Sequence, residues 1–205
     1  MRIGIDFDNT IAGYDEAFLV AAKARDLVDD GFVGGKSTLR DAVRGLEDGE
    51  HKWQALQGRV YGAHMEDATM MPDLAEFLSL CSKEALDVYI VSHKTEFGHF
   101  DPDKINLREA ALEWMKTQGF FDPNKFDISP SHIFFESTRA EKLARIGELD
   151  LDVFIDDLPE VLSDPDFPKD PQRVLYDPAG SNDDVPYDRV SSWKDITQGV
   201  FHGPA

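Results

Sequence analysis

The chain contains a single cysteine, Cys81, among its 205 residues. One thiol cannot form an intramolecular disulfide, nor can it supply a zinc site built from several thiolates. Cys81 lies in a stretch with helical periodicity, so we expect a small buried apolar side chain there. Such sparse use of cysteine is typical of the cytosol, and we predict a cytoplasmic protein.

Positive charge is also scarce, because 21 lysines and arginines face 40 aspartates and glutamates and leave a formal charge of −19. A surface this acidic argues against binding a DNA or RNA polymer, and we assign the charge to solubility. No apolar run approaches the roughly 18 residues of a membrane-spanning helix. The first residues follow a strand pattern instead of a basic and then apolar leader, so we expect neither secretion nor a membrane partner.

Five short runs rich in β-branched and aromatic residues predict strands, and helical periodicities separate most of them. The runs cover residues 2–6, 87–91, 132–135, 151–155 and 173–176. Strands that alternate with helices in this way are typical of a parallel sheet with crossover helices. With 41% hydrophobic residues, the chain has enough apolar side chains for a substantial core. The predicted fold class is therefore α/β.

Three of the crossover helices have recognisable start or stop signals. The periodicity predicts the first two over residues 73–84 and 106–118. Pro72 is expected at the first helical position of the earlier one. Thr138 followed by Glu141 predicts a capping box, which opens a third helix that ends at Gly147.

The segment 13–71 is too long for a simple connection between the first strand and the helix after Pro72. Its periodicity predicts helices of its own, separated by glycine-rich breaks. They are expected over residues 15–28, 37–46 and 50–62. We therefore predict a core domain of residues 1–12 and 72–205, with a small helical cap inserted as residues 13–71.

Two pairs of carboxylates follow predicted strands, Asp6 with Asp8 and Asp156 with Asp157. Aspartate after a strand is also an ordinary turn former, so either pair alone leaves a turn as the alternative. The carboxyl ends of strands in an open α/β sheet form the ligand-binding edge, where both pairs would meet. Carboxylates about 4 Å apart repel by roughly 4 kcal/mol at an effective dielectric near 20, so they need a proton or a cation. Hard oxygen ligands of this kind favour Mg²⁺.

These residues resemble the haloacid dehalogenase (HAD) superfamily of hydrolases over most of the chain. Residues 6–10, Asp-Phe-Asp-Asn-Thr, are similar to its first motif, Asp-x-Asp-x-Thr. Ser92 after an apolar strand resembles the second motif, Lys142 the third, and Asp156 with Asp157 the fourth. The resemblance implies a Rossmann-like three-layer parallel sheet in the strand order 5-4-1-2-3, with a small helical cap.

The same resemblance implies a catalytic role for Asp6, Asp8 and Lys142. Asp6 would attack phosphorus and form an aspartyl-phosphate, while the Asp8 side chain would protonate the leaving group and then deprotonate water. Lys142 would add a positive charge near the phosphate. Mg²⁺ would be held by Asp6, Asp8 through its main-chain carbonyl, and Asp156, with Asp157 assisting.

Candidate substrate-binding residues are Thr10 and three residues at the end of the second predicted core strand, Ser92, His93 and Lys94. Purely structural alternatives stay open. Ser92 can form a local hydrogen bond to the backbone, and Asp157 can cap the turn that follows it. Arg139, in the same predicted helix, is an alternative to Lys142 as the cation.

The predicted function is Mg²⁺-dependent hydrolysis of a small phosphate monoester, such as a sugar phosphate. A halide leaving group needs no general acid, so the presence of Asp8 favours phosphate ester cleavage over carbon–halogen cleavage. One alternative is a 5′-nucleotidase acting on (deoxy)nucleoside monophosphates. Another, from a different class, is a catalytically silent HAD-fold binding or regulatory protein, or an acidic protein that recruits basic partners.

Overall fold

The computed structural model describes residues 1–100, 103–182 and 185–202. The chain divides into two compact units. The first unit comprises residues 1–12, 70–94 and 118–205, and the second comprises residues 13–69 and 95–117.

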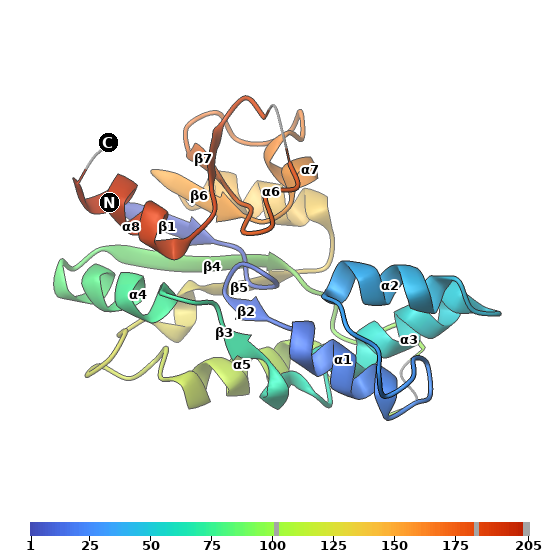
Figure 1. The fold of residues 1–205 in the computed structure, drawn as a ribbon. Helices are drawn as coiled ribbons and strands as arrows, with labels where there is room; N and C mark the ends of the chain where they lie inside the picture. Colours follow the sequence, from blue (N-terminus) through green and yellow to red (C-terminus); the bar gives the residue numbers. More distant parts are fainter. Residues whose placement is uncertain (101–102, 183–184, 203–205) are drawn as a thin grey trace. The chain divides into compact units, whose positions relative to one another are not determined.

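The first unit contains a six-stranded sheet in the order β5-β4-β1-β6-β7-β8, in which every neighbouring pair is parallel (Figure 1). The strands are β1 (Arg2–Ile5), β4 (Asp87–His93), β5 (Ile133–Glu136), β6 (Val153–Asp156), β7 (Gln172–Tyr176) and β8 (Asp188–Val190). The first five strands confirm the predicted order and the Rossmann-like class. Strand β8 was not predicted, because two of its three residues are charged and it extends the sheet at an edge.

Helices cover both faces of this sheet. They are α4 (Leu74–Lys83), α6 (Arg139–Glu148), α7 (Pro159–Leu162) and α8 (Trp193–His202), and a short 3₁₀ turn, η2 (Pro130–His132), precedes β5. Leu175 of β7 packs in one hydrophobic cluster with side chains of α6 and α7. The next residue, Tyr176, contacts Trp193 of α8, with ring centroids 5.8 Å apart. Because successive strand residues point to opposite faces, the unit has the three layers that the resemblance to the HAD superfamily implies.

In the first unit, one predicted helix start and one predicted helix stop differ from the structure. Asp73, in the left-handed region with φ of 64°, is the N-cap of α4, so Pro72 lies before the helix and not at its first position. Helix α6 begins with the predicted capping box of Thr138 and Glu141, but it continues through Gly147 to Glu148. A glycine weakens a helix by only about 1 kcal/mol, and the packing of α6 on the sheet outweighs that.

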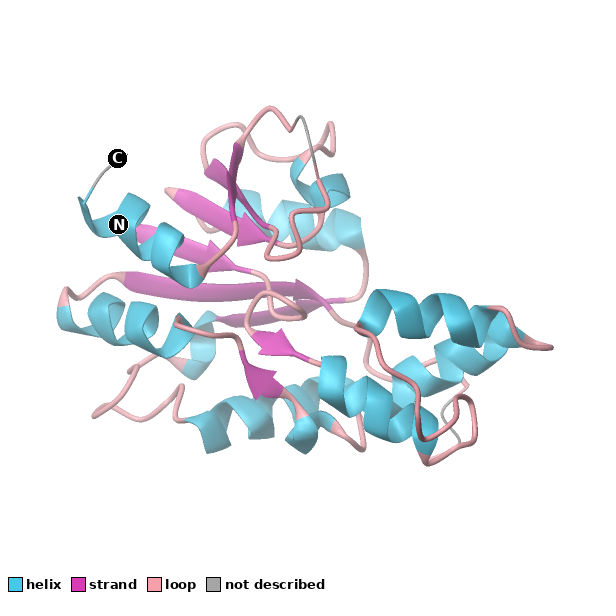
Figure 2. Ribbon diagram, viewed as in Figure 1, coloured by secondary structure: helices cyan, strands magenta, loops and turns pink. Residues whose placement is uncertain are grey.

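The second unit is helical (Figure 2). It holds α1 (Asp15–Lys23), α2 (Lys36–Arg44), α3 (Gly49–Tyr61), the 3₁₀ turn η1 (Met65–Asp67) and all but the last residue of α5 (Leu107–Gln118). An aromatic cluster forms its core, in which Phe18 stacks on Trp53 with ring centroids 5.0 Å apart. The short strands β2 (Ala12–Gly13) and β3 (Thr69–Met70) form a separate two-stranded sheet.

Residues 95–117 belong to this second unit, although the predicted boundaries placed only residues 13–71 in the insertion. Gly98 lies so close to Gly58 that a Cβ at position 98 would come within 2.4 Å of the Gly58 Cα. The indole of Trp114 donates a hydrogen bond of 3.0 Å to the carbonyl of Ala68. Such contacts over long sequence separation cannot be read from local patterns. Among the described residues, no helix combines the length and apolar character needed to cross a membrane.

The environment of Cys81 leads to a chemical prediction. Its side chain is buried in α4, and burial raises the pKa of the thiol to about 12. Because the thiolate is the reactive form, we expect iodoacetamide at pH 8 to leave the folded protein unlabelled and to label it fully in urea. Mass spectrometry measures both. Rapid labelling of the folded protein would contradict this burial.

Candidate active site

Two aspartates meet at the carboxyl edge of the sheet because β1 and β6 are neighbours in register. Ile5 pairs with Ile155, and the next residues along the two strands are Asp6 and Asp156. The backbone N–H of Asp6 donates to the Ile155 carbonyl at 2.9 Å, which continues the ladder to the site. Asp6 is 4% exposed and Asp156 is fully buried. The register therefore brings together residues 150 positions apart.

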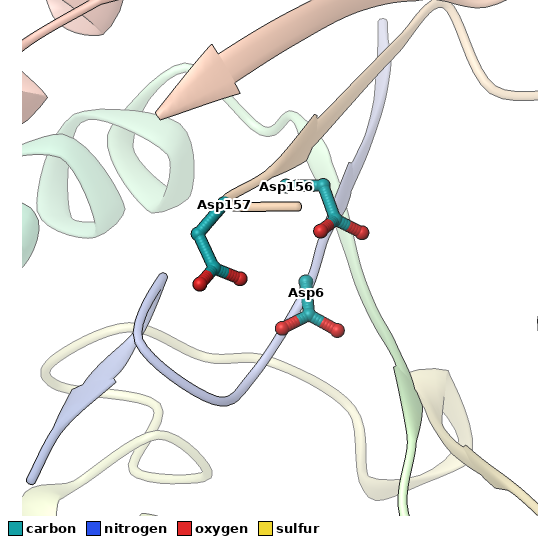
Figure 3. A group of neighbouring side chains, drawn as sticks. All are labelled: Asp6, Asp156 and Asp157. Atoms are coloured by element: carbon teal, nitrogen blue, oxygen red, sulfur yellow. The ribbon is translucent and has the colours of Figure 1, made fainter. Parts of the chain in front are cut away.

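Asp157 completes a cluster of three carboxylates, shown in Figure 3. Each residue offers one oxygen, and these oxygens lie within 4.8 Å of one another. Asp157 is half-buried, whereas the other two side chains are enclosed. A spacing of this order suits oxygen ligands around one divalent cation, and an all-carboxylate donor set suits a hard ion such as Mg²⁺. The residues present therefore fit the implied metal.

A buried ammonium group balances part of this charge. Lys142 of α6 is 1% exposed, and its Nζ lies 2.6 Å from both Asp6 Oδ1 and Asp156 Oδ2. Burial opposes the charge on Lys142, but the attraction of Asp156 and Asp6 raises its pKa above the ordinary lysine value. Burial and the nearby Asp6 charge raise the pKa of Asp156, against the opposing effect of Lys142. The three groups form one electrostatic unit.

The second carboxylate of the first motif, Asp8, forms an ion pair with a different lysine, Lys94. The Nζ of Lys94 lies 3.0 Å from Asp8 Oδ1 and 2.9 Å from Asp8 Oδ2. Lys94 is 3% exposed and follows the last residue of β4. We predicted from the sequence that Lys94 binds the substrate. In the structure its ammonium group contacts the carboxylate of Asp8.

The remaining predicted residues lie at the same edge but in different surroundings. Ser92 is buried near the end of β4. Thr10 is fully buried, and its Oγ1 has no hydrogen-bond partner among the described residues. The exposed His93 has its Nε2 3.0 Å from the carbonyl oxygen of Ser137, before α6.

One supporting residue was not predicted. The indole N–H of Trp193, in α8, donates to the main-chain carbonyl of Thr10 at 3.1 Å. Trp193 is fully buried, so this bond ties the loop after β1 to the last helix. The sequence around Trp193 does not specify a partner 183 residues away.

The sequence matches no protein-family model and no curated protein. Solved structures do match. A HAD-superfamily hydrolase of subfamily IA from Geobacter sulfurreducens PCA is 13% identical, with a TM-score of 0.58 over 95% of this chain and 93% of that one. The chain has the haloacid dehalogenase fold.

Two other solved structures with the HAD fold also match nearly the whole chain. A HAD-superfamily hydrolase from Ehrlichia chaffeensis is 12% identical, with a TM-score of 0.55 over 98% of this chain and 96% of that one. An L-2-haloacid dehalogenase is 13% identical, with a TM-score of 0.54 over 97% of each chain. Since these identities are low, the likeness concerns the fold, and the chemistry must be argued from the residues of the site.

The position of Lys142 between two buried carboxylates predicts a large effect on stability. Lys142→Met would leave Asp6 and Asp156 without their cation, so in EDTA we expect a loss of about 3–5 kcal/mol in the free energy of unfolding. Urea denaturation measures this loss. The matched control is Lys116→Met, an exposed lysine with an (i, i+3) partner, which should cost less than about 0.5 kcal/mol. Equal stability of Lys142→Met and the unmodified protein would contradict the assigned ion pairs.

Proposed function

We propose that the protein is a Mg²⁺-dependent phosphomonoester hydrolase that acts through an aspartyl-phosphate on Asp6. Its substrate would be a small phosphorylated metabolite, such as a sugar phosphate. The observation that supports this most strongly is the convergence of Asp6, Asp156 and Lys142 at the carboxyl edge of a HAD-fold sheet, with Asp8 two residues after Asp6. The fold alone would not separate the activities that share it.

The first step forms a bond between an Asp6 carboxylate oxygen and phosphorus. The phosphorus–oxygen bond to the alcohol breaks, and Asp8 donates a proton to the departing oxygen. In the second step, water attacks phosphorus and gives a proton to Asp8. This releases inorganic phosphate and restores the Asp6 carboxylate, so atoms and charges balance over the cycle.

Both anions in the first step, the phosphate and Asp6, need neutralising. Lys142 supplies one fixed positive charge beside Asp6. A divalent cation bound by Asp6, Asp156 and the main-chain carbonyl of Asp8, with Asp157 beside them, would supply the rest of that positive charge. Burial of this group strengthens each of these interactions relative to water.

Asp8 favours phosphate ester cleavage over dehalogenation. A halide departs as a stable anion, whereas an alkoxide needs a proton, and Asp8 is the acid placed to give it. This distinction matters because the structures with a similar fold include a haloacid dehalogenase. Retention of Asp6, Asp8, Lys142 and Asp156 also weighs against a catalytically silent protein, which needs none of this charge.

The nucleotidase alternative has weaker support. Aromatic side chains of the second unit are the natural candidates to stack on a base. However, Phe18 and Trp53 are buried and stack on each other, and Tyr14 is buried against the ring of Tyr61, 4.9 Å away between centroids. Core packing accounts for these contacts, so a sugar phosphate or a similar small ester is preferred.

A phosphatase panel with Mg²⁺ tests the proposal. We expect phosphate release from at least one sugar phosphate, nucleotide or aryl phosphate, and loss of that release in EDTA. Asp6→Asn removes the nucleophile and should lower kcat by at least about 10³-fold. Asp150→Asn, at an exposed position, is the matched control and should leave kcat unchanged. No release from any substrate, or full activity of Asp6→Asn, would contradict the proposal.

A further inference from the structure

The ion pair between Lys94 and Asp8 is not explained by the reaction steps above, which use Asp8 but not Lys94. The Nζ of Lys94 contacts both oxygens of the Asp8 carboxylate, at 3.0 and 2.9 Å. A single ammonium group that contacts both oxygens restricts the rotation of that carboxylate about its terminal torsion. The side chain of Lys94 is 2% exposed, and that of Asp8 is 20% exposed.

The backbone on each side of this pair is already fixed by other bonds. The N–H groups of Ile11 and Ala12 both donate to the carbonyl of Phe7 at 3.0 Å, which closes a tight loop around Asp8. The N–H of Lys94 donates to the Glu136 carbonyl at 2.9 Å and extends the pairing of β4 with β5. The ion pair is therefore not needed to hold either main chain, and what it determines is the direction of the Asp8 carboxylate.

Apolar surroundings strengthen the contact. The Nζ of Lys94 lies 5.3 Å from the ring centroid of Phe7, and that ring is fully buried in a T-shaped contact with Phe135. Removing a lysine from water is costly unless it gains a well-aligned partner. A buried lysine whose ammonium group ends on the half-buried carboxylate of the proposed acid is better explained by use of that carboxylate than by packing alone.

We propose that Lys94 is a positioning residue for catalysis, which holds the Asp8 carboxylate in the orientation that transfers a proton to the leaving-group oxygen. This inference rests on the proposed phosphatase function and deepens it. Lys142 acts on the nucleophile side through Asp6, and Lys94 acts on the leaving-group side through Asp8. Each of the two buried lysines among the described residues thus serves a different carboxylate of the first motif.

Two aryl phosphates of similar shape separate this role from a structural one. Phenyl phosphate releases phenol, whose pKa is about 10, and depends on a proton from the acid. p-Nitrophenyl phosphate releases a much more acidic phenol and depends on it little. For Lys94→Met we expect kcat on phenyl phosphate to fall by roughly 10²-fold, because a misplaced catalytic group costs about that much. On p-nitrophenyl phosphate, kcat should fall less than about threefold, and KM should change little for both.

A double-mutant cycle gives the second readout. Asp8→Asn removes the acid, so adding Lys94→Met to it should cause no further loss on phenyl phosphate if Lys94 acts through Asp8. Lys83→Met, at an exposed position on α4, is the matched control and should change neither substrate's kcat. Circular dichroism checks that each variant folds, and Lys94→Gln replaces Lys94→Met if the latter does not.

The outcomes are distinguishable. A selective loss on phenyl phosphate that disappears in the Asp8→Asn background supports the inference. Equal losses on both substrates, no loss, or a full additional loss in the double variant would overturn it while leaving the phosphatase proposal intact. An unmodified protein that releases phosphate from no substrate would overturn both.

Discussion

The site depends on one interaction, the buried ammonium of Lys142 held 2.6 Å from both Asp6 and Asp156. Without it, two enclosed carboxylates on neighbouring strands would repel each other at the end of the central part of the sheet. With it, they remain side by side and still carry more negative charge than one lysine neutralises, particularly since Asp157 lies beside them. This residual charge is what makes the group a suitable site for a divalent cation.

The rest of the first unit positions the side chains of Asp6, Asp156 and Lys142. The pairing of Ile5 with Ile155 sets Asp6 and Asp156 next to each other. The capping box at Thr138 fixes where α6 begins, and the Thr138 carbonyl accepts the N–H of Lys142 at 3.1 Å in the first turn. The proposed activity thus follows from strand register and helix capping, two local features that the sheet brings together.

The positions of the five main strands followed from local apolar runs, and their order was implied by the resemblance to the HAD superfamily. The grouping of Asp6, Asp156 and Asp157 followed from carboxylates at the ends of predicted strands. Strand β8 was not predicted from the sequence, because it is only three residues long and two of them are charged. The place of residues 95–117 in the second unit and the contact of Lys94 with Asp8 depend on packing between distant segments. No periodicity or motif spacing encodes such packing, so these two features could be seen only in the structure.

The most direct test of the central claim is anomalous diffraction from crystals grown with Mn²⁺, which is bound by the same oxygen ligands as Mg²⁺. The account predicts one strong peak between the carboxylates of Asp6, Asp156 and Asp157, and loss of that peak in crystals of Asp156→Asn. A peak elsewhere, or none at this cluster at saturating Mn²⁺, would contradict it.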